Sequence, residues 1–225
     1  MKEAEARELI VEMARSMFER RLTFGSSGNI SVKIDGGWLM TPTGSSLGRL
    51  DPARLSKINE AGTLISGDAP TKESFLHLAM YRERAGAGAV VHLHSTHSVA
   101  VSCLEGIDPD DVLPPITAYY VMRVGKLPLI PYYAPGDKTL GEAVGKYAAK
   151  HAAVLLANHG PVVSGSSLSA AVDAIEELEE TARLYLLLHG RPTRYLNPAQ
   201  VADLKRRFPQ GVIAGATDLR PLFTT

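Results

Sequence analysis

The segment that most constrains the fold is residues 152–157, a run of apolar residues that ends at Asn158-His159-Gly160. A strand that is apolar at every position is typical of a sheet covered on both faces, because neither of its faces then contacts water. Residues 89–93 form a short segment with two adjacent β-branched valines, Val90 and Val91, and predict another strand. The chain therefore favours an α/β architecture in which helices flank one sheet.

The remaining elements follow from helical periodicity, turn signals and capping residues. Thr71 and Ser167 are suited to cap two of the helices, and Asp35-Gly36 predicts a hairpin between two strands. No internal repeat or linker divides the chain, so residues 1–225 are predicted to form one domain. We expect helices over residues 3–21, 72–84, 97–104 and 167–189, strands over 29–34 and 38–41, and a short helix after Pro198 followed by an irregular tail.

Composition excludes several classes of partner. The formal net charge is zero, with 24 basic and 24 acidic residues, so we expect neither nucleic acid nor an anionic membrane. No apolar run reaches the roughly 18 residues of a membrane span, and residues 1–17 do not resemble a signal peptide. The single cysteine, Cys103, suits a reducing compartment, and its apolar neighbours predict a buried side chain. We therefore expect a cytoplasmic protein.

Three of the seven histidines have the surroundings of metal ligands. His92 and His94 are separated by one residue in a predicted strand, which places both side chains on one face, roughly 6–7 Å apart. His159 follows the buried strand over residues 152–157, where chain ends commonly gather to form a site. Three histidines leave a coordination position open for substrate, as in catalytic zinc sites. The spacing alone is equally compatible with two polar residues on the face of a sheet.

Glu73 and two glycine-rich loops are further candidates. Glu73 lies in the first turn of its predicted helix, where an acidic residue favours the helix dipole, but its carboxylate could instead face a metal as ligand or general acid/base. His77, one turn further along, could order that helix or this carboxylate. Segments 25–29 and 43–46 are ordinary turns in one interpretation and could cradle a phosphate in another, with Thr71 completing the nest.

Five short motifs occur in order along the chain: GSSGNIS at 25–31, TPTG at 41–44, Lys72-Glu73, HLH at 92–94 and NHG at 158–160. Each is weak alone, but together they resemble the class II aldolase/adducin family over about residues 5–195, which leaves a short helical tail. The resemblance implies an α/β/α sandwich around a largely antiparallel sheet, assembled as a homotetramer with active sites between subunits.

The resemblance also implies the contents of the site. It implies one divalent ion per subunit on His92, His94 and His159, with zinc preferred over manganese, cobalt or iron, and with Glu73 as a catalytic acid that can also coordinate. A tyrosine from the neighbouring subunit donates a proton in the aldolases, and its position maps to Tyr119, with Tyr120 as the alternative. The phosphate-binding positions of the family map to Asn29, Thr43, Gly44, Thr71 and Lys72.

The residue before the catalytic acid departs from the sugar-phosphate aldolases of the family, which have two serines where this chain has Thr71-Lys72. Lys72 adds a positive charge that could bind either the phosphate or the carboxylate of a substrate. With this segment the chain is most similar to the branch of the family that decarboxylates 3-oxo-tetronate 4-phosphates in the breakdown of four-carbon sugar acids.

A common chemistry joins this branch to the aldolases. A 3-oxo acid loses its carboxylate when the electrons left at C2 flow into the C3 carbonyl, and a divalent ion stabilises the resulting enediolate as a Lewis acid. An aldolase forms the same enediolate, so the three histidines do not separate the two activities; the resemblance to the decarboxylase branch, with Lys72 as the group that could recognise a carboxylate, implies decarboxylation to dihydroxyacetone phosphate and carbon dioxide. The alternatives are a sugar-phosphate aldolase or epimerase, such as one like fuculose-phosphate aldolase, a dehydratase of a sulfur-containing ribulose phosphate, and a non-catalytic adducin-like interaction module.

Overall fold

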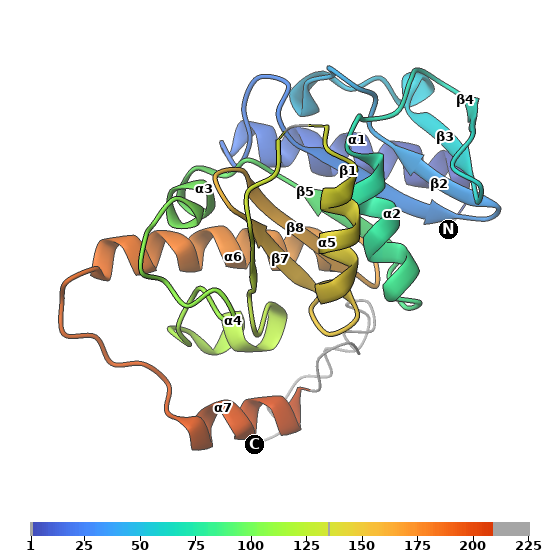
Figure 1. Cartoon of the computed structure of the whole chain (residues 1–225). Coiled ribbons are helices and arrows are strands. Elements are labelled where there is room, and N and C mark those ends of the chain that lie inside the picture. Colours follow the sequence, from blue (N-terminus) through green and yellow to red (C-terminus); the bar gives the residue numbers. More distant parts are fainter. Residues whose placement is uncertain (1, 135, 209–225) are drawn as a thin grey trace, which may run out of the picture.

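A mixed sheet of eight strands runs through the molecule in the order β4-β3-β2-β1-β5-β8-β7-β6 (Figure 1). The computed structural model describes residues 2–134 and 136–208. All neighbouring pairs of strands are antiparallel except β6 and β7, which confirms the largely antiparallel sheet expected from the sequence. The strands are β1 (Asn29–Ile34), β2 (Gly37–Met40), β3 (Ser56–Asn59), β4 (Leu64–Ser66), β5 (Ala89–His92), β6 (Leu129–Ile130), β7 (Ala153–Leu156) and β8 (Gly160–Gly165).

Helices cover both faces of this sheet and give the expected α/β/α arrangement (Figure 1). One face carries α1 (Glu3–Glu19), α3 (Thr96–Ser102), α4 (Ala118–Arg123) and α6 (Leu168–Leu188), and the other carries α2 (Ser74–Glu83) and α5 (Thr139–Ala148). Two short 3-10 turns, Leu47–Arg49 and Pro52–Arg54, lie against α1, and α7 (Pro198–Arg207) lies against α4. Among the described residues, no helix is both long and apolar enough to cross a membrane.

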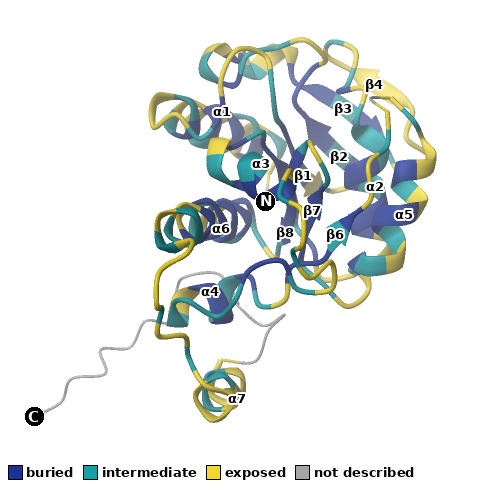
Figure 2. Ribbon diagram, turned by 60° about the vertical axis from the view of Figure 1, so that its left-hand side comes forward, coloured by how far each residue is buried: buried dark blue, intermediate teal, exposed yellow. Residues whose placement is uncertain are grey.

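Strand β7 shows why the apolar run predicts a two-sided sheet. Ala153 and Leu155 belong to the core beneath α1 and α6, whereas Val154 and Leu156 belong to the core beneath α2 and α5. Every residue of the strand is therefore buried, and the burial pattern in Figure 2 is darkest along such central strands. The prediction for residues 152–157 is confirmed, with each end one residue shorter.

Two local predictions near the candidate site were wrong by a few residues. Helix α2 begins at Ser74, and its N-cap is Glu73 rather than Thr71. The Thr71 hydroxyl accepts a hydrogen bond of 3.2 Å from the backbone N–H of Glu73, which closes a turn before the helix instead of capping it. Strand β5 ends at His92, so His94 lies just beyond the strand.

The sequence patterns missed β3, β4, β6, β8, α4 and α5, for reasons that differ between elements. Strand β4 is exposed at every residue and β6 has two residues, so neither carries an apolar pattern. Strand β8 begins with Gly160-Pro161, a pair that argues against a central strand. Helix α5 contains two glycines, which lower helix propensity.

The prediction that Cys103 is buried was also wrong. Its apolar neighbours belong to α3, which buries one face, whereas Cys103 lies at the C-cap of that helix and is exposed. The side-chain amide of Asn158 donates a hydrogen bond of 3.3 Å to its sulfur.

A buried carboxylate in the middle of α6 holds the start of α3. Glu179 accepts hydrogen bonds from the backbone N–H groups of His97 and Ser98, from the Ser98 hydroxyl and from the ring of His97, at distances of 2.7–2.9 Å. Because the first N–H groups of a helix have no partner within the helix, this side chain satisfies donors that would otherwise be buried without one. Glu179 therefore joins α6 to the segment that directly follows His94.

We expect Glu179→Ala to lower the free energy of unfolding by about 2–4 kcal/mol, because it leaves several buried donors without an acceptor. Thermal or urea unfolding of the purified variant measures this. Glu180→Ala is the matched control, since Glu180 is exposed and its ion pair with Arg183, at 3.4 Å, is exposed as well. Equal stability of the two variants would show that Glu179 does not anchor α3.

Candidate metal centre

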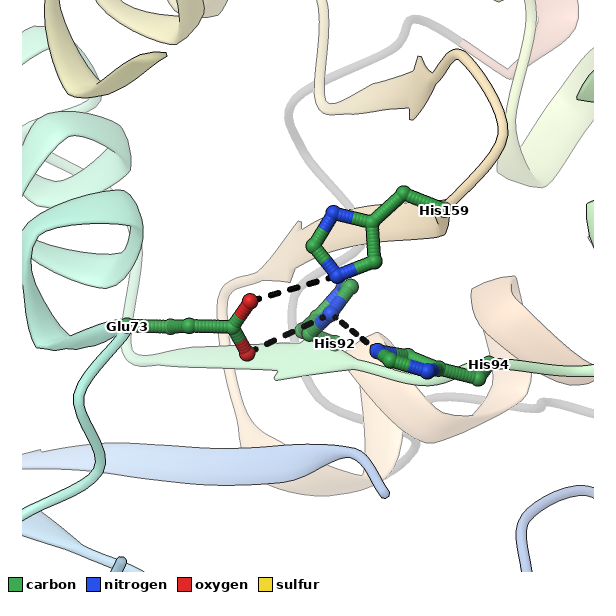
Figure 3. Close-up of side chains that lie close together, drawn as sticks. All are labelled: Glu73, His92, His94 and His159. Atoms are coloured by element: carbon green, nitrogen blue, oxygen red, sulfur yellow. Dashed lines mark hydrogen bonds and ion pairs between the residues drawn. The ribbon is translucent and has the colours of Figure 1, made fainter. Parts of the chain in front are cut away.

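Four side chains that could ligate a metal converge at one end of the central strands (Figure 3). Glu73, His92, His94 and His159 each place one ligand atom in a group whose members lie within 4.8 Å of one another. His92 is fully buried, while the side chains of Glu73 and His159 are 21% and 18% exposed. The group is therefore enclosed by protein at His92 and is accessible to solvent at Glu73 and His159.

The separations between these atoms fit one ion. A tetrahedral zinc site with ligands at about 2.0–2.1 Å has ligand–ligand separations of about 3.3–3.4 Å by geometry. His92 Nε2 lies 3.1 Å from His94 Nε2, Glu73 Oε1 lies 3.2 Å from His159 Nε2, and Glu73 Oε2 lies 3.5 Å from His92 Nε2. Three imidazoles and one carboxylate are ligands typical of zinc and of related divalent ions. The residues present therefore fit the metal that the resemblance implies.

The turn between β7 and β8 brings His159 to the end of β5. Asn158 adopts a left-handed conformation with φ of 55°, which asparagine tolerates better than most residues. Gly160 has φ of 152°, and a Cβ atom built there would lie 2.3 Å from the carbonyl oxygen of Leu93. Only glycine allows this close approach, so the NHG motif places His159 beside the segment that carries His92 and His94.

The chemistry of His92 is set by a backbone contact. Its Nδ1 lies 2.8 Å from the carbonyl oxygen of Pro161, which can only accept a hydrogen bond. Nδ1 therefore carries the proton and Nε2 presents a lone pair toward the other ligands. Burial lowers the pKa of His92 to about 3, so the ring is neutral at neutral pH, as a metal ligand must be. Burial also lowers the pKa of His94.

Glu73 is held as a carboxylate. Burial raises its pKa, but the hydrogen bond from His159 and a 2.8 Å hydrogen bond from the Asn29 amide outweigh burial, and the pKa lies well below its usual range. The acidic residue of the predicted helix thus faces the centre from the N-cap, directly before the first turn of α2.

The structure also brings together the loops expected to bind phosphate. Pro42 and Pro70 form an isolated bridge, and the backbone N–H of Thr43 donates to the carbonyl of Ala69 at 2.9 Å. The hydroxyl of Thr41 accepts from the N–H of Ile30 at 3.1 Å, which ties the same loop to the start of β1 beside Asn29. Within these loops, Thr43, Gly44 and Lys72 are exposed, whereas Asn29 and Thr71 are buried. Their phosphate-binding role remains a prediction.

The two tyrosines of α4 have different surroundings. Tyr119 is 59% exposed and lies beneath the guanidinium of Arg123, and within the described residues no hydrogen bond, ion pair or ring contact joins it to the four candidate ligand side chains of the same chain. Tyr120 is buried in the core with its hydroxyl lacking a hydrogen-bond partner among the described residues, and burial raises its pKa. The side chain of Tyr119 is therefore open to contact from outside the chain, whereas that of Tyr120 is enclosed by the core.

Sequence reasoning missed three residues that support the centre. The carbonyl of Pro161 orients His92, and no side-chain pattern could have indicated it. Ser31 and Tyr81 lie in a buried polar network behind Glu73. In β1 the polar residues Asn29 and Ser31 lie on one face of the strand, and the apolar residues Ile30 and Val32 lie on the other. Two polar residues on one buried face were the sequence signal that could have indicated this network.

Fold and centre together define a class of protein, an α/β/α sandwich in which three histidines and a carboxylate among the described residues form a group that could hold a metal ion. Residues 8–186 match the family described as the Class II Aldolase and Adducin N-terminal domain. The chain belongs to this family, as its ordered motifs predicted.

Several relatives are similar over most of their length. The 3-oxo-tetronate 4-phosphate decarboxylase of Escherichia coli strain K12 is 52% identical over 204 residues, which cover 90% of this chain and 96% of that protein. The L-fuculose phosphate aldolase of Methanocaldococcus jannaschii is 34% identical over 177 residues, which cover 79% of this chain and 93% of that protein. The crystal structure of YgbL from Escherichia coli has a TM-score of 0.89 at 50% identity and covers 90% of this chain and 99% of that chain.

Proposed function

We propose that this chain is a metal-dependent carbon–carbon lyase that decarboxylates a 3-oxo-tetronate 4-phosphate. The observation that carries the proposal is the 52% identity, over 90% of the chain, to proteins named for that activity. The aldolase relatives support the alternative activity only at lower identity, 34% in the case of Methanocaldococcus jannaschii. The complete set of metal ligands disfavours a non-catalytic adducin-like module.

The reaction breaks the bond between C1 and C2 of the substrate. Its electron pair moves into the bond between C2 and C3 while the C3 carbonyl takes the negative charge, and C1 leaves as carbon dioxide. A divalent ion on the three histidines supplies a Lewis acid beside that charge. A proton added at C2 then completes dihydroxyacetone phosphate. We assign this proton to Tyr119 of a neighbouring subunit, with Glu73 as the acid/base that faces the reacting oxygens.

We further propose that the ion is zinc, that the chain forms a homotetramer and that it acts in the cytoplasm. Zinc is supported by the nitrogen-rich ligand set, and assembly by the exposed Tyr119, which has no partner at the centre of its own chain among the described residues. Binding of phosphate is assigned to the loops that carry Thr43, Gly44, Thr71 and Lys72, with Asn29 beside them.

The direct test supplies purified protein with 3-oxo-tetronate 4-phosphates and measures carbon dioxide and dihydroxyacetone phosphate together. Equal amounts of the two products are expected. Release of dihydroxyacetone phosphate from L-fuculose 1-phosphate, with no carbon dioxide from the 3-oxo acid, would instead establish the aldolase.

Lys72 provides a prediction that separates the two activities. Its side chain is exposed in the loop before Glu73, where it can reach an anionic substrate. Lys72→Ser, which restores the residue of the aldolases, is expected to raise KM for the 3-oxo acid phosphate by about 10–100-fold and to lower kcat less, because a charged hydrogen bond is worth about 1.5–3 kcal/mol. Attraction to a carboxylate that is about to leave would not accelerate its departure.

Steady-state kinetics of Lys72→Ser measures this split. Arg82→Ser is the control, since it removes an exposed cation from the other end of α2. An unchanged KM in Lys72→Ser would remove the role of this lysine in substrate binding.

A further inference from the structure

A continuous chain of hydrogen bonds runs from α2 through β1 to the carboxylate of the centre. The Tyr81 hydroxyl lies 2.9 Å from Ser31 Oγ, which lies 2.7 Å from His77 Nδ1. On the other side of the ring, His77 Nε2 lies 2.5 Å from Asn29 Oδ1, and Asn29 Nδ2 donates to Glu73 Oε2 at 2.8 Å. Five side chains, from β1 and from α2 with its N-cap, thus form one linear series of hydrogen bonds that ends on the carboxylate of Glu73, a candidate metal ligand.

The direction of this chain follows from its last member. The Glu73 carboxylate can only accept, so the Asn29 amide must turn its NH₂ toward Glu73 and its oxygen toward His77. His77 must then donate from Nε2, which leaves Nδ1 to accept from Ser31 when the ring is neutral. Ser31 in turn accepts from Tyr81. Every donor therefore points toward the metal centre.

Burial makes this arrangement rigid. His77 and Ser31 are fully buried, and Asn29 and Tyr81 are 5% and 8% exposed. Water therefore does not compete for these donors, and an amide in the reversed orientation would place its oxygen against a carboxylate in a dry environment. Burial also lowers the pKa of His77 to about 4, which agrees with the neutral ring that the chain requires.

We propose that His77 is a positioning residue that fixes the orientation of the Asn29 amide and, through it, holds the Glu73 carboxylate on the metal centre. This inference rests on the metal site of the proposed function. It assigns His77 no contact with substrate or ion, and the imidazole acts through one N–H donor. Partners of this kind, one contact behind the ligands, typically change metal affinity 10–100-fold when removed.

Two amide variants of His77 separate positioning from packing. Glutamine reaches about as far as Nε2 and can still donate to Asn29, whereas asparagine is one methylene shorter and can contact Ser31 only. His77→Asn is expected to weaken zinc binding to the apoprotein about 10–100-fold, and His77→Gln to weaken it less than about threefold. Competition with a chromophoric chelator measures both affinities without any assay of turnover, and thermal unfolding reports the stability of each variant.

A double-mutant cycle tests whether the effect passes through the carboxylate. In a Glu73→Ala background the hydrogen-bond network no longer ends on a carboxylate, so His77→Asn should change zinc affinity less than about threefold. The visible spectrum of the cobalt-substituted protein should change in His77→Asn and remain close to the wild-type spectrum in His77→Gln.

The results distinguish failure of the positioning role from failure of the proposed function. Wild-type protein that binds no metal would contradict the centre itself, and metal binding without decarboxylation would contradict the assigned reaction only. Equal affinities of His77→Asn and His77→Gln, or an undiminished effect of His77→Asn in the Glu73→Ala background, would overturn the positioning role.

Discussion

His92→Ala is expected to lower kcat/KM for decarboxylation by about 10²–10⁴-fold. A bound ion contributes several kcal/mol of charge stabilisation in the transition state, and each 1.4 kcal/mol is worth a factor of ten. His92 is the fully buried ligand, and its Nε2 lies within 3.5 Å of both His94 Nε2 and Glu73 Oε2. Its loss should therefore empty the site, and metal analysis of the purified variant should find far less than one ion per chain.

The matched control is His189→Ala, which removes an exposed histidine at the end of α6. This variant should retain its metal and its turnover. Full metal content and normal turnover in His92→Ala would show that the centre lies elsewhere.

Tyr119→Phe is expected to lower kcat by about 10²–10⁴-fold, the usual contribution of a positioned general acid, while the metal content stays at the wild-type level. Tyr119 is exposed, and in the proposed homotetramer its hydroxyl donates a proton to a substrate bound by another subunit. Removing it should leave the enediolate without its proton donor and leave the ligands intact.

The control for this prediction is the adjacent tyrosine. Tyr120→Phe removes a buried hydroxyl that has no hydrogen-bond partner among the described residues, so activity should change little. Mixed assemblies of Tyr119→Phe and His92→Ala chains should regain part of the activity if the tyrosine acts across subunits, because some sites then combine an intact ligand set with an intact tyrosine. Wild-type kinetics in Tyr119→Phe would move the proton donor to Glu73 or to solvent.

The central layers of the fold could be predicted because burial has a short-range signature. Strand β7 is apolar at each position because both of its faces are covered, and the spacing of His92 and His94 placed both on one side of the same segment. The ordered motifs then indicated the family. By contrast, β4 and β6 have no such signature, since one is exposed and the other is two residues long.

What the sequence determined by itself was therefore the set of candidate ligand residues, which the structure brings together, and the type of fold. The tertiary structure decided how those ligands are held. Ser31 and Asn29 lie 46 and 48 residues before His77, and nothing in a local pattern selects this partner from the other polar residues of the chain. Gly160 was recognisable as a motif residue, but its close approach to Leu93 exists only once β5 and β8 pair. Periodicity predicts which face of an element is buried. Which two buried polar groups become hydrogen-bond partners depends on how the whole core packs, because only packing brings them together and excludes water from their hydrogen bond.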